Sequence, residues 1–330
     1  MPEISTLLPL APWLLLILAA EFVNGWTDAP NAIATVVSTR VLRPSQAVIM
    51  AAVLNAAGAF AGTAVAATIG KGIIRPEAIN IQTVGAAMVG IVIWSTAAWY
   101  YGLPTSESHG LVAGLAGAGL ATAGPSVLLW AGWKKVLIGL AFSTFLGFGG
   151  ALVLMTGILW IFRHTRPGLV RRIFGRLQVV SAALMAFSHG SNDGQKFIGV
   201  FTLALVLGGI LPEFQVPAWV ILLCATTMGI GTAVGGWRII KTLGLSLTKL
   251  EPVHGFAAET AAGLTIQGAA FFGIPLSTTH TISTAIMGVG AVRRVSAVRW
   301  GVAGSIVLAW ILTFPVCGLI AYVAAKLVAN

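Results

Sequence analysis

Apolar runs of about 20 residues recur along the whole length of this 330-residue chain, as membrane-spanning α-helices require. Charged residues make up only 8% of the sequence, whereas a soluble domain carries about 25%. No polar stretch is long enough to form a soluble domain. The formal net charge of +10 does not indicate nucleic acid binding, because the lysines and arginines are spread among short loops between apolar runs. We therefore predict an all-α polytopic protein of the lipid bilayer.

The chain has only two aspartates, Asp28 and Asp193, and each lies in a polar motif inside an apolar run. The motifs are NGWTDAPN at residues 24–31 and HGSNDGQK at residues 189–196. An ionised carboxylate at membrane depth costs about 2.5–3.5 kcal/mol even on the lenient insertion scale. Because glycine or proline follows each aspartate, we expect both motifs to break their helices and to form a duplicated ion-handling site. The alternative is a polar pair that pins two helices together.

The two halves of the chain are related in sequence. Aligning Asp28 with Asp193 sets an offset of 165, GTAV at 62–65 recurs at 231–234, and GLPTSESH at 102–109 corresponds to GIPLSTTH at 273–280. Three matches in the same order indicate a duplication. We predict a first membrane repeat at 1–162, a basic cytoplasmic connecting loop at 163–176 and a second membrane repeat at 177–330.

Each half contains five apolar elements, within a total of about 10–12 membrane elements. An odd number of crossings per half would place the second half upside down, so we predict two inverted repeats with broken or re-entrant helices. With the central loop in the cytoplasm, 13 lysines and arginines lie on the cytoplasmic side and 5 on the outside. Because cytoplasmic loops carry the excess of basic residues, this count predicts a multi-pass cell-membrane protein with both termini outside. The elements are expected at 8–40, 44–68, 79–101, 104–121 and 133–162, and at 173–211, 217–239, 253–272, 275–291 and 297–326.

A second duplicated motif combines a proline with a cluster of hydroxyls, PTSESH at 104–109 and PLSTTH at 275–280. The proline ends one helix, and the hydroxyls follow at the expected start of the next. Hydroxyls and free backbone N–H groups that converge on one point suit a tetrahedral oxyanion, although simple N-capping would need the same residues. The predicted oxyanion ligands are Thr105, Ser106, Ser108, Ser277, Thr278 and Thr279.

The aspartate motifs supply the candidates for binding a cation or a proton, namely Asp28, Asn31, Asn24, Asp193, Asn192 and Lys196. Lys196 is three residues after Asp193, so the two can meet on one helical face, either as a built-in cation or as a structural salt bridge. His109, His280 and Glu21 are candidates for a proton relay. The alternatives are helix–helix hydrogen bonds for the histidines and a pair with a base such as Lys196 for Glu21. No cofactor is expected, and no metal ligand is assigned.

These motifs resemble the signatures of the PiT inorganic phosphate transporters. GWTDAPNA at 25–32 looks like the family's first G-x-N-D-x-x-N-A signature, and NDGQK at 192–196 looks like the second in its bacterial low-affinity form. The resemblance extends over nearly the whole chain. It implies symport of inorganic phosphate with a cation, a substrate held between the repeats, and a homodimer.

Two departures from the family pattern bear on the coupling ion. Thr27 stands where the family usually has Asn, and Lys196 stands where repeat symmetry and the sodium-coupled members predict Asn. The second departure favours protons over sodium. The resemblance leaves sulfate as an alternative substrate, and phosphate carried as a neutral metal complex as another.

Two other classes of function share parts of the pattern. An anion channel would use the hydroxyls but would not need the aspartates. An intramembrane hydrolase could use paired aspartates and a Ser-x-Ser-His sequence, but an enzyme needs one active site and both motifs are duplicated. We therefore expect a transporter and not an enzyme.

Overall fold

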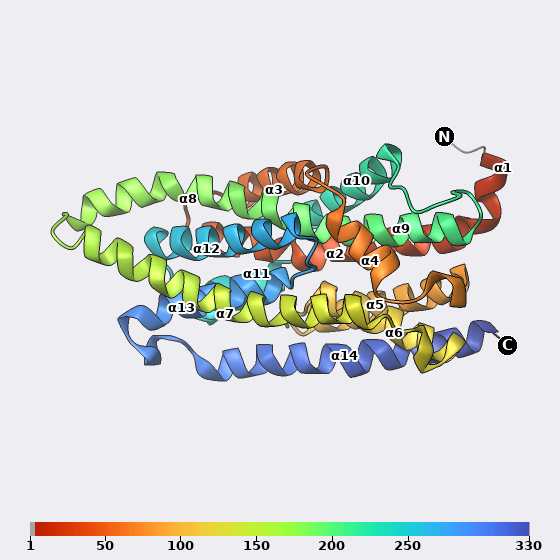
Figure 1. Cartoon of the computed structure of the whole chain (residues 1–330). Helices are drawn as coiled ribbons and strands as arrows, with labels where there is room; N and C mark the ends of the chain where they lie inside the picture. The colour runs from red at the N-terminus through yellow and green to blue at the C-terminus, as the bar shows by residue number, and fades with distance from the viewer. Residues whose placement is uncertain (1–3, 330) are drawn as a thin grey trace.

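The computed structural model describes residues 4–329, and its helices run mostly along one long axis (Figure 1). The described residues contain no β-strand, only an isolated bridge between Ile74 and Leu128. In the first half the helices are α1 (Ile4–Leu7), α2 (Ala11–Ser38), α3 (Pro44–Ala59), α4 (Ala64–Gly72), α5 (Ile81–Tyr100), α6 (Glu107–Ala123) and α7 (Trp130–Ile161). In the second half they are α8 (Pro167–His189), the π-helical turn η4 (Gly190–Gly194), α9 (Gln195–Leu207), α10 (Ala218–Val234), α11 (Trp237–Lys241), α12 (Pro252–Phe271), α13 (Thr278–Arg293) and α14 (Trp300–Ala329).

All ten predicted apolar elements contain helix, and two of them are bent. The element predicted at 44–68 consists of α3 and α4, which meet at 70°, and the element at 217–239 contains α10, which meets the helical segment Trp237–Ser246 at 61°. The predicted loop at 163–176 is wrong in part, because α8 already begins at Pro167. Proline favours the first turn of a helix, since its fixed φ angle suits the helix and no N–H is needed there.

The predicted breaks inside the two aspartate motifs are also wrong. Helix α2 runs without interruption through residues 24–31 and contains Pro30. The second motif forms the π-helical turn η4, which joins α8 to α9 with no gap between them. A proline removes one intrahelical hydrogen bond, and neighbouring helices and side chains can compensate for it in a membrane protein.

Within residues 4–329, four helices are long and apolar enough to cross a membrane, and up to six spans result if each bent pair counts as one. Helices α6 and α13 have 17 and 16 residues, so at 1.5 Å per residue they extend about 25 Å, less than the roughly 30 Å of a hydrocarbon core. Ten full crossings therefore stay a prediction, and short helices that begin at a buried polar motif fit re-entrant segments equally well.

The two halves of the chain are interlocked. Helix α7 packs along α13 of the other half, and α14 packs along α6. Likewise α3 packs against α8, and α10 packs against α2. The repeat relates these contacts in pairs: α7 on α13 corresponds to α14 on α6, and α3 on α8 corresponds to α10 on α2.

Two separate apolar cores result from this packing. One includes the first half of α2 with α5, α6, α9 and α10, and the other includes the second half of α2 with α8, α12 and α13. The aspartates of the motifs belong to neither core.

Both termini lie at one end of the molecule, and the connection between α7 and α8 lies at the other (Figure 1). We call this second end the linker end. Helix α2 leaves the end that holds the termini, whereas α8 starts at the linker end. This arrangement fits inverted repeats, which stay a prediction.

Candidate ion and oxyanion site

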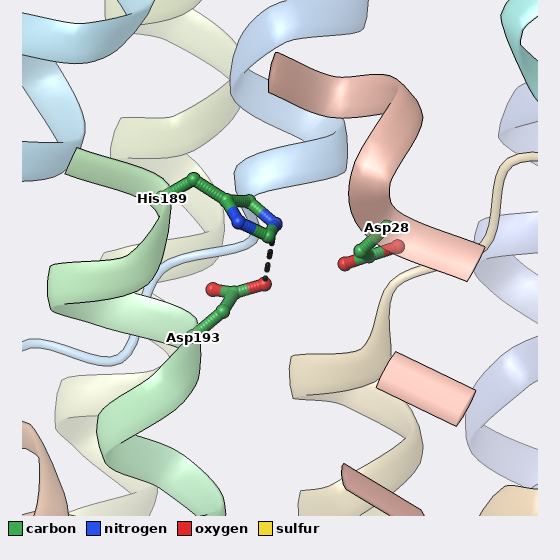
Figure 2. A group of neighbouring side chains, drawn as sticks. All are labelled: Asp28, His189 and Asp193. Carbon is green, nitrogen blue, oxygen red and sulfur yellow. Dashed lines mark ion pairs between the residues drawn. The ribbon is translucent and has the colours of Figure 1, made fainter. Parts of the chain in front are cut away.

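The two aspartate motifs form one site between the halves and not two separate sites. Asp28 comes from α2, and His189 and Asp193 come from the end of α8 and from η4 (Figure 2). One ligand atom of each of these three residues lies within 4.8 Å of those of the other two. The starts of α6 and α13 complete the site, since side chains from both helices bond to the aspartate motifs.

Asp193 is at the centre of the hydrogen-bond network. Its Oδ1 forms an ion pair with Lys196 Nζ, and its Oδ2 accepts a hydrogen bond of 2.9 Å from Thr278 Oγ1 and lies 3.5 Å from His189 Nε2. The ion pair predicted from the three-residue spacing is therefore confirmed. The widened π-helical turn carries Asp193 itself, and such turns are frequent at functional sites.

Lys196 connects the second aspartate motif to the hydroxyl motifs of both halves. Its ammonium donates hydrogen bonds to Ser108 Oγ and, at 3.0 Å, to the carbonyl oxygen of Leu276. Ser108 donates in turn to the same carbonyl at 2.6 Å. With Asp193 these contacts occupy all three N–H groups, so a fully buried cation is held by three oxygens.

Asp28 has a looser environment. Thr279 Oγ1 lies 3.4 Å and 3.5 Å from its two carboxylate oxygens. Asn31 Nδ2 donates to Thr279 Oγ1 at 2.9 Å and to Thr278 Oγ1 at 3.3 Å. The Oδ1 atom of Asn31 has no hydrogen-bond partner in the described residues, so it is an oxygen donor available to a cation.

The side chain of Asn192, a predicted ion ligand, bonds to the backbone, and its role in ion binding stays a prediction. Its Oδ1 accepts from Leu276 N at 3.2 Å, and its Nδ2 donates to Ile274 O at 3.2 Å. The carboxamide thus holds the backbone on both sides of Pro275 and fixes the approach to α13.

The predicted oxyanion ligands separate into two groups. Ser106 Oγ accepts from His109 N at 3.3 Å and Ser277 Oγ accepts from His280 N at 3.1 Å, so both are N-caps. Ser108, Thr278 and Thr279 instead bond to charged groups of the aspartate motifs. Thr105 is buried beside them and makes no hydrogen bond with its side chain in residues 4–329.

The three candidates for a proton relay lie apart from this network. Glu21 Oε2 accepts from Asn24 Nδ2 at 2.9 Å, while Glu21 Oε1 and Asn24 Oδ1 have no partner among the described residues. The alternative pairing of Glu21 with Lys196 is wrong, because the ion pair of Lys196 is with Asp193. The rings of His109 and His280 contact each other at a tilt of 45°, with centroids 4.6 Å apart, and neither bonds to an aspartate within residues 4–329.

Two buried residues of the site, Glu107 and His189, were not predicted. Glu107 accepts hydrogen bonds from Thr27 at 2.8 Å and Ser95 at 2.9 Å, and His189 contacts Asn55 Oδ1 at 3.1 Å. The signal was in the motifs, because Glu107 lies within the first hydroxyl motif and His189 opens the second aspartate motif. The partner residues are distant in sequence and could not be identified from it.

The site is closed and rich in carboxylates. None of Asp28, Asp193, Lys196, Ser108, Thr278 and Thr279 is more than 4% exposed. Fully ionised, Asp28, Asp193 and Glu107 would place three negative charges against the one ammonium of Lys196. Access from water therefore requires a second conformation.

A closed polar site between interlocked helical halves is typical of a membrane transport protein. The chain belongs to the phosphate transporter family, whose model matches residues 24–170 and 163–321. It is 48% identical to the "Probable low-affinity inorganic phosphate transporter" of Rhizobium meliloti (strain 1021), over 94% of each chain. It is 41% identical to the protein of the same name from Bacillus subtilis (strain 168), over 92% of this chain and 93% of the relative.

A solved structure shares the fold. "The sodium-dependent phosphate transporter" superposes with a TM-score of 0.90, covering 96% of this chain and 98% of its own, at 23% sequence identity. The family resemblance seen in the motifs is thus confirmed, as is the prediction of a helical membrane protein. The names of the relatives agree with transport and not with enzymatic activity.

Proposed function

We propose that this protein is a secondary active symporter that imports inorganic phosphate together with a cation, and that the cation is a proton. The observation that carries the proposal is the contact of Lys196 with both Asp193 and Ser108, which joins a coupling carboxylate to a hydroxyl motif. The relatives are named for inorganic phosphate, and nothing among them favours sulfate.

The order of binding follows from charge. Accumulating a divalent anion against an inside-negative potential costs about 4.6 kcal/mol per 100 mV, twice the value for a single charge. With its carboxylates ionised, the site repels such an anion, because the carboxylates outnumber the one ammonium. Protonation of Asp28 or entry of a cation beside it removes that repulsion. Ser108, Thr278 and Thr279 can then turn their hydroxyls towards phosphate oxygens, so each ligand favours the binding of the other.

Lys196 supports proton coupling. A sodium ion at Asp193 would need the oxygens that the ammonium already contacts, namely Asp193 Oδ1, Ser108 Oγ and Leu276 O. A fixed ammonium neutralises that carboxylate without an ion from solution. Coupling would then need only Asp28.

Sodium coupling is the second candidate, and it rests on the environment of Asp28. The Asp28 carboxylate, Thr279 Oγ1 and the unpaired Asn31 Oδ1 are oxygen donors that suit a small hard cation. The structural neighbour is described as sodium-dependent. The two candidates differ in which gradient drives uptake.

Alternating access would open this closed site to one side at a time. We propose that one bundle rocks against the other around the aspartates, as inverted repeats permit. Asn31 donates to Thr278 across the two halves, so both residues are expected to exchange partners during the movement. A channel would need no closed state, and a hydrolase would need no driving gradient.

The remaining features of the proposal follow the sequence. We propose that the protein lies in the cell membrane as a homodimer, with the linker end in the cytoplasm and both termini outside, as the distribution of bases predicts. Phosphate carried as a neutral metal complex is a variant of the same cycle, and it predicts uptake that depends on a divalent metal.

The deciding experiment is uptake of radiolabelled phosphate and sulfate by proteoliposomes, with pH and sodium gradients imposed separately. The proposal requires saturable phosphate accumulation driven by an inward proton gradient and collapsed by a protonophore. Accumulation driven by a sodium gradient alone would identify sodium, and not the proton, as the coupling ion. Equilibration without accumulation would indicate a channel, and preference for sulfate would contradict the substrate.

A further inference from the structure

A second polar cavity lies away from the aspartate site, where the chain enters α12 and passes from α13 to α14. It has a volume of about 620 Å³. We propose that this cavity binds a phosphate-bearing anion that is not being transported. The residues that would contact the anion are Thr248, Lys249, His254, Arg294, Ser296 and Arg299.

The cavity is preformed by hydrogen bonds between its two connecting segments. Thr248 Oγ1 donates to Ala297 O at 3.1 Å. Arg299 donates from its backbone N to Leu247 O at 3.0 Å, and from Nη1 to Ser246 O at 3.4 Å. The segment before α12 and the segment before α14 are therefore fixed to one another, so a ligand would meet an existing pocket.

The charge of the cavity is of one sign. Its lining holds Lys249, Arg294 and Arg299 and no acidic residue. No carboxylate within residues 4–329 forms an ion pair with Lys249, Arg294 or Arg299 at 4.0 Å or less. Guanidinium groups and hydroxyls together match the geometry of a phosphate group, which accepts several hydrogen bonds at once.

The cavity is separate from the transport site. The two share no residue, and Gly290 in the cavity wall is 11 residues beyond Thr279 on α13, about 16 Å along the helix at 1.5 Å per residue. Next to it lies a cavity of about 350 Å³ that shares His254. Its lining combines apolar residues such as Ile158, Leu159 and Phe162 with the charged residues Arg163, Arg171 and Glu251. A phospholipid headgroup with an adjacent acyl chain and a free phosphate ion both fit this arrangement, and both present the same phosphate chemistry.

Protection of Lys249 from acetylation tests the proposal. The full-length protein is delipidated in detergent, treated with an amine-reactive acetylating reagent, and analysed by mass spectrometry of its peptides. Lys241 is the internal control, because it is an exposed lysine that does not line the cavity. One arm titrates inorganic phosphate against chloride at constant ionic strength. The other compares nanodiscs of phosphatidylcholine alone with nanodiscs that also contain phosphatidylglycerol.

Binding of the anion in the cavity should slow acetylation of Lys249 about fivefold and leave Lys241 unchanged. This factor corresponds to the attraction of about 1 kcal/mol between one lysine and an anionic headgroup. Protection in the phosphate arm identifies a soluble anion, and protection in the lipid arm identifies an anionic lipid. The double variant Arg294→Gln/Arg299→Gln should lose the protection, and its elution in size-exclusion chromatography verifies folding. Equal behaviour of the two lysines, protection that persists in the double variant, or no protection in either arm would overturn the proposal.

Discussion

The side-chain nitrogen of Asn31 lies 2.9 Å from the hydroxyl oxygen of Thr279, so the first aspartate motif is bonded to the hydroxyl motif of the opposite half. The second aspartate motif makes the corresponding contacts through Lys196 to Ser108 of the first half. Each hydroxyl motif therefore contacts the aspartate motif of the other half. The site exists only when both halves are assembled, which is why its residues are scattered along the chain.

Asp28→Asn and Asp193→Asn are each expected to abolish coupled phosphate uptake, with a loss of at least about tenfold, equivalent to 1.4 kcal/mol. Asparagine keeps the shape of the side chain but cannot carry the charge that a proton or cation neutralises. Uptake in proteoliposomes at matched protein content measures the effect. Glu213→Gln, which removes an exposed carboxylate far from the site in sequence, is the control. Accumulation at the wild-type rate by either variant would show that its aspartate has no coupling role.

Thr278→Ala and Thr279→Ala are expected to raise the apparent KM for phosphate about 10- to 150-fold, since a lost hydrogen bond to a charged group costs about 1.5–3 kcal/mol. Replacement by serine keeps the hydroxyl and should largely restore the KM. Initial uptake rates over a range of phosphate concentrations provide the measurement. A KM that does not change in both alanine variants would assign these threonines to structure alone.

Ser106→Ala and Ser277→Ala are expected to act mainly on stability. Both hydroxyls cap helices, and the loss of an N-cap costs about 0.5–2 kcal/mol. Thermal unfolding in detergent should show a lower Tm for each variant, with a smaller effect on KM than in the threonine variants. A large rise in KM at unchanged Tm would instead identify these serines as phosphate ligands.

Lys196→Asn is expected to change the coupling ion, because it restores the residue pattern of the first motif and removes the fixed ammonium beside Asp193. Uptake should fall under a pure pH gradient and recover, at least in part, when sodium is added. Lys241→Asn removes an exposed lysine and is the matched control. The idea fails if wild-type uptake already requires sodium, or if the variant keeps its ion dependence.

Gly25→Ala is expected to destabilise the protein by about 1–3 kcal/mol, the usual cost of overpacking. A Cβ atom at Gly25 would overlap the backbone of Met228 on α10. Gly157→Ala, on α7, is the matched control because a Cβ there meets nothing within 4 Å, and it should be neutral or slightly stabilising. The comparison of Tm values in detergent tests the close packing of α2 on α10. Similar Tm values for the two variants would contradict it.

The helices could be predicted well where an apolar run has clear ends. The element predicted at 79–101 is α5 at Ile81–Tyr100, which starts after the capping residue Asn80. The breaks at the aspartate motifs were predicted wrongly, because a single proline such as Pro30 shows only that one hydrogen bond is lost. Whether the helix continues depends on neighbours that the local sequence does not reveal.

The site could be predicted in part. The pair of Asp193 and Lys196 follows from their spacing on a helix. Ligands and caps could not be distinguished in the hydroxyl motifs, because both roles place a serine or threonine at the start of a helix. The contact between Thr27 and Glu107 joins residues 80 positions apart, so only the folded structure brings them together.

The exchange of helices between the halves has a consequence for biogenesis. The principal neighbour of α6 is α14, and α7 packs along α13, so both partners are synthesised after most of the other helices described. The first half of the chain therefore enters the bilayer with two helix faces that stay uncovered until α13 and α14 have been synthesised. A protein truncated before α13 would keep both aspartates and still lack a folded first half.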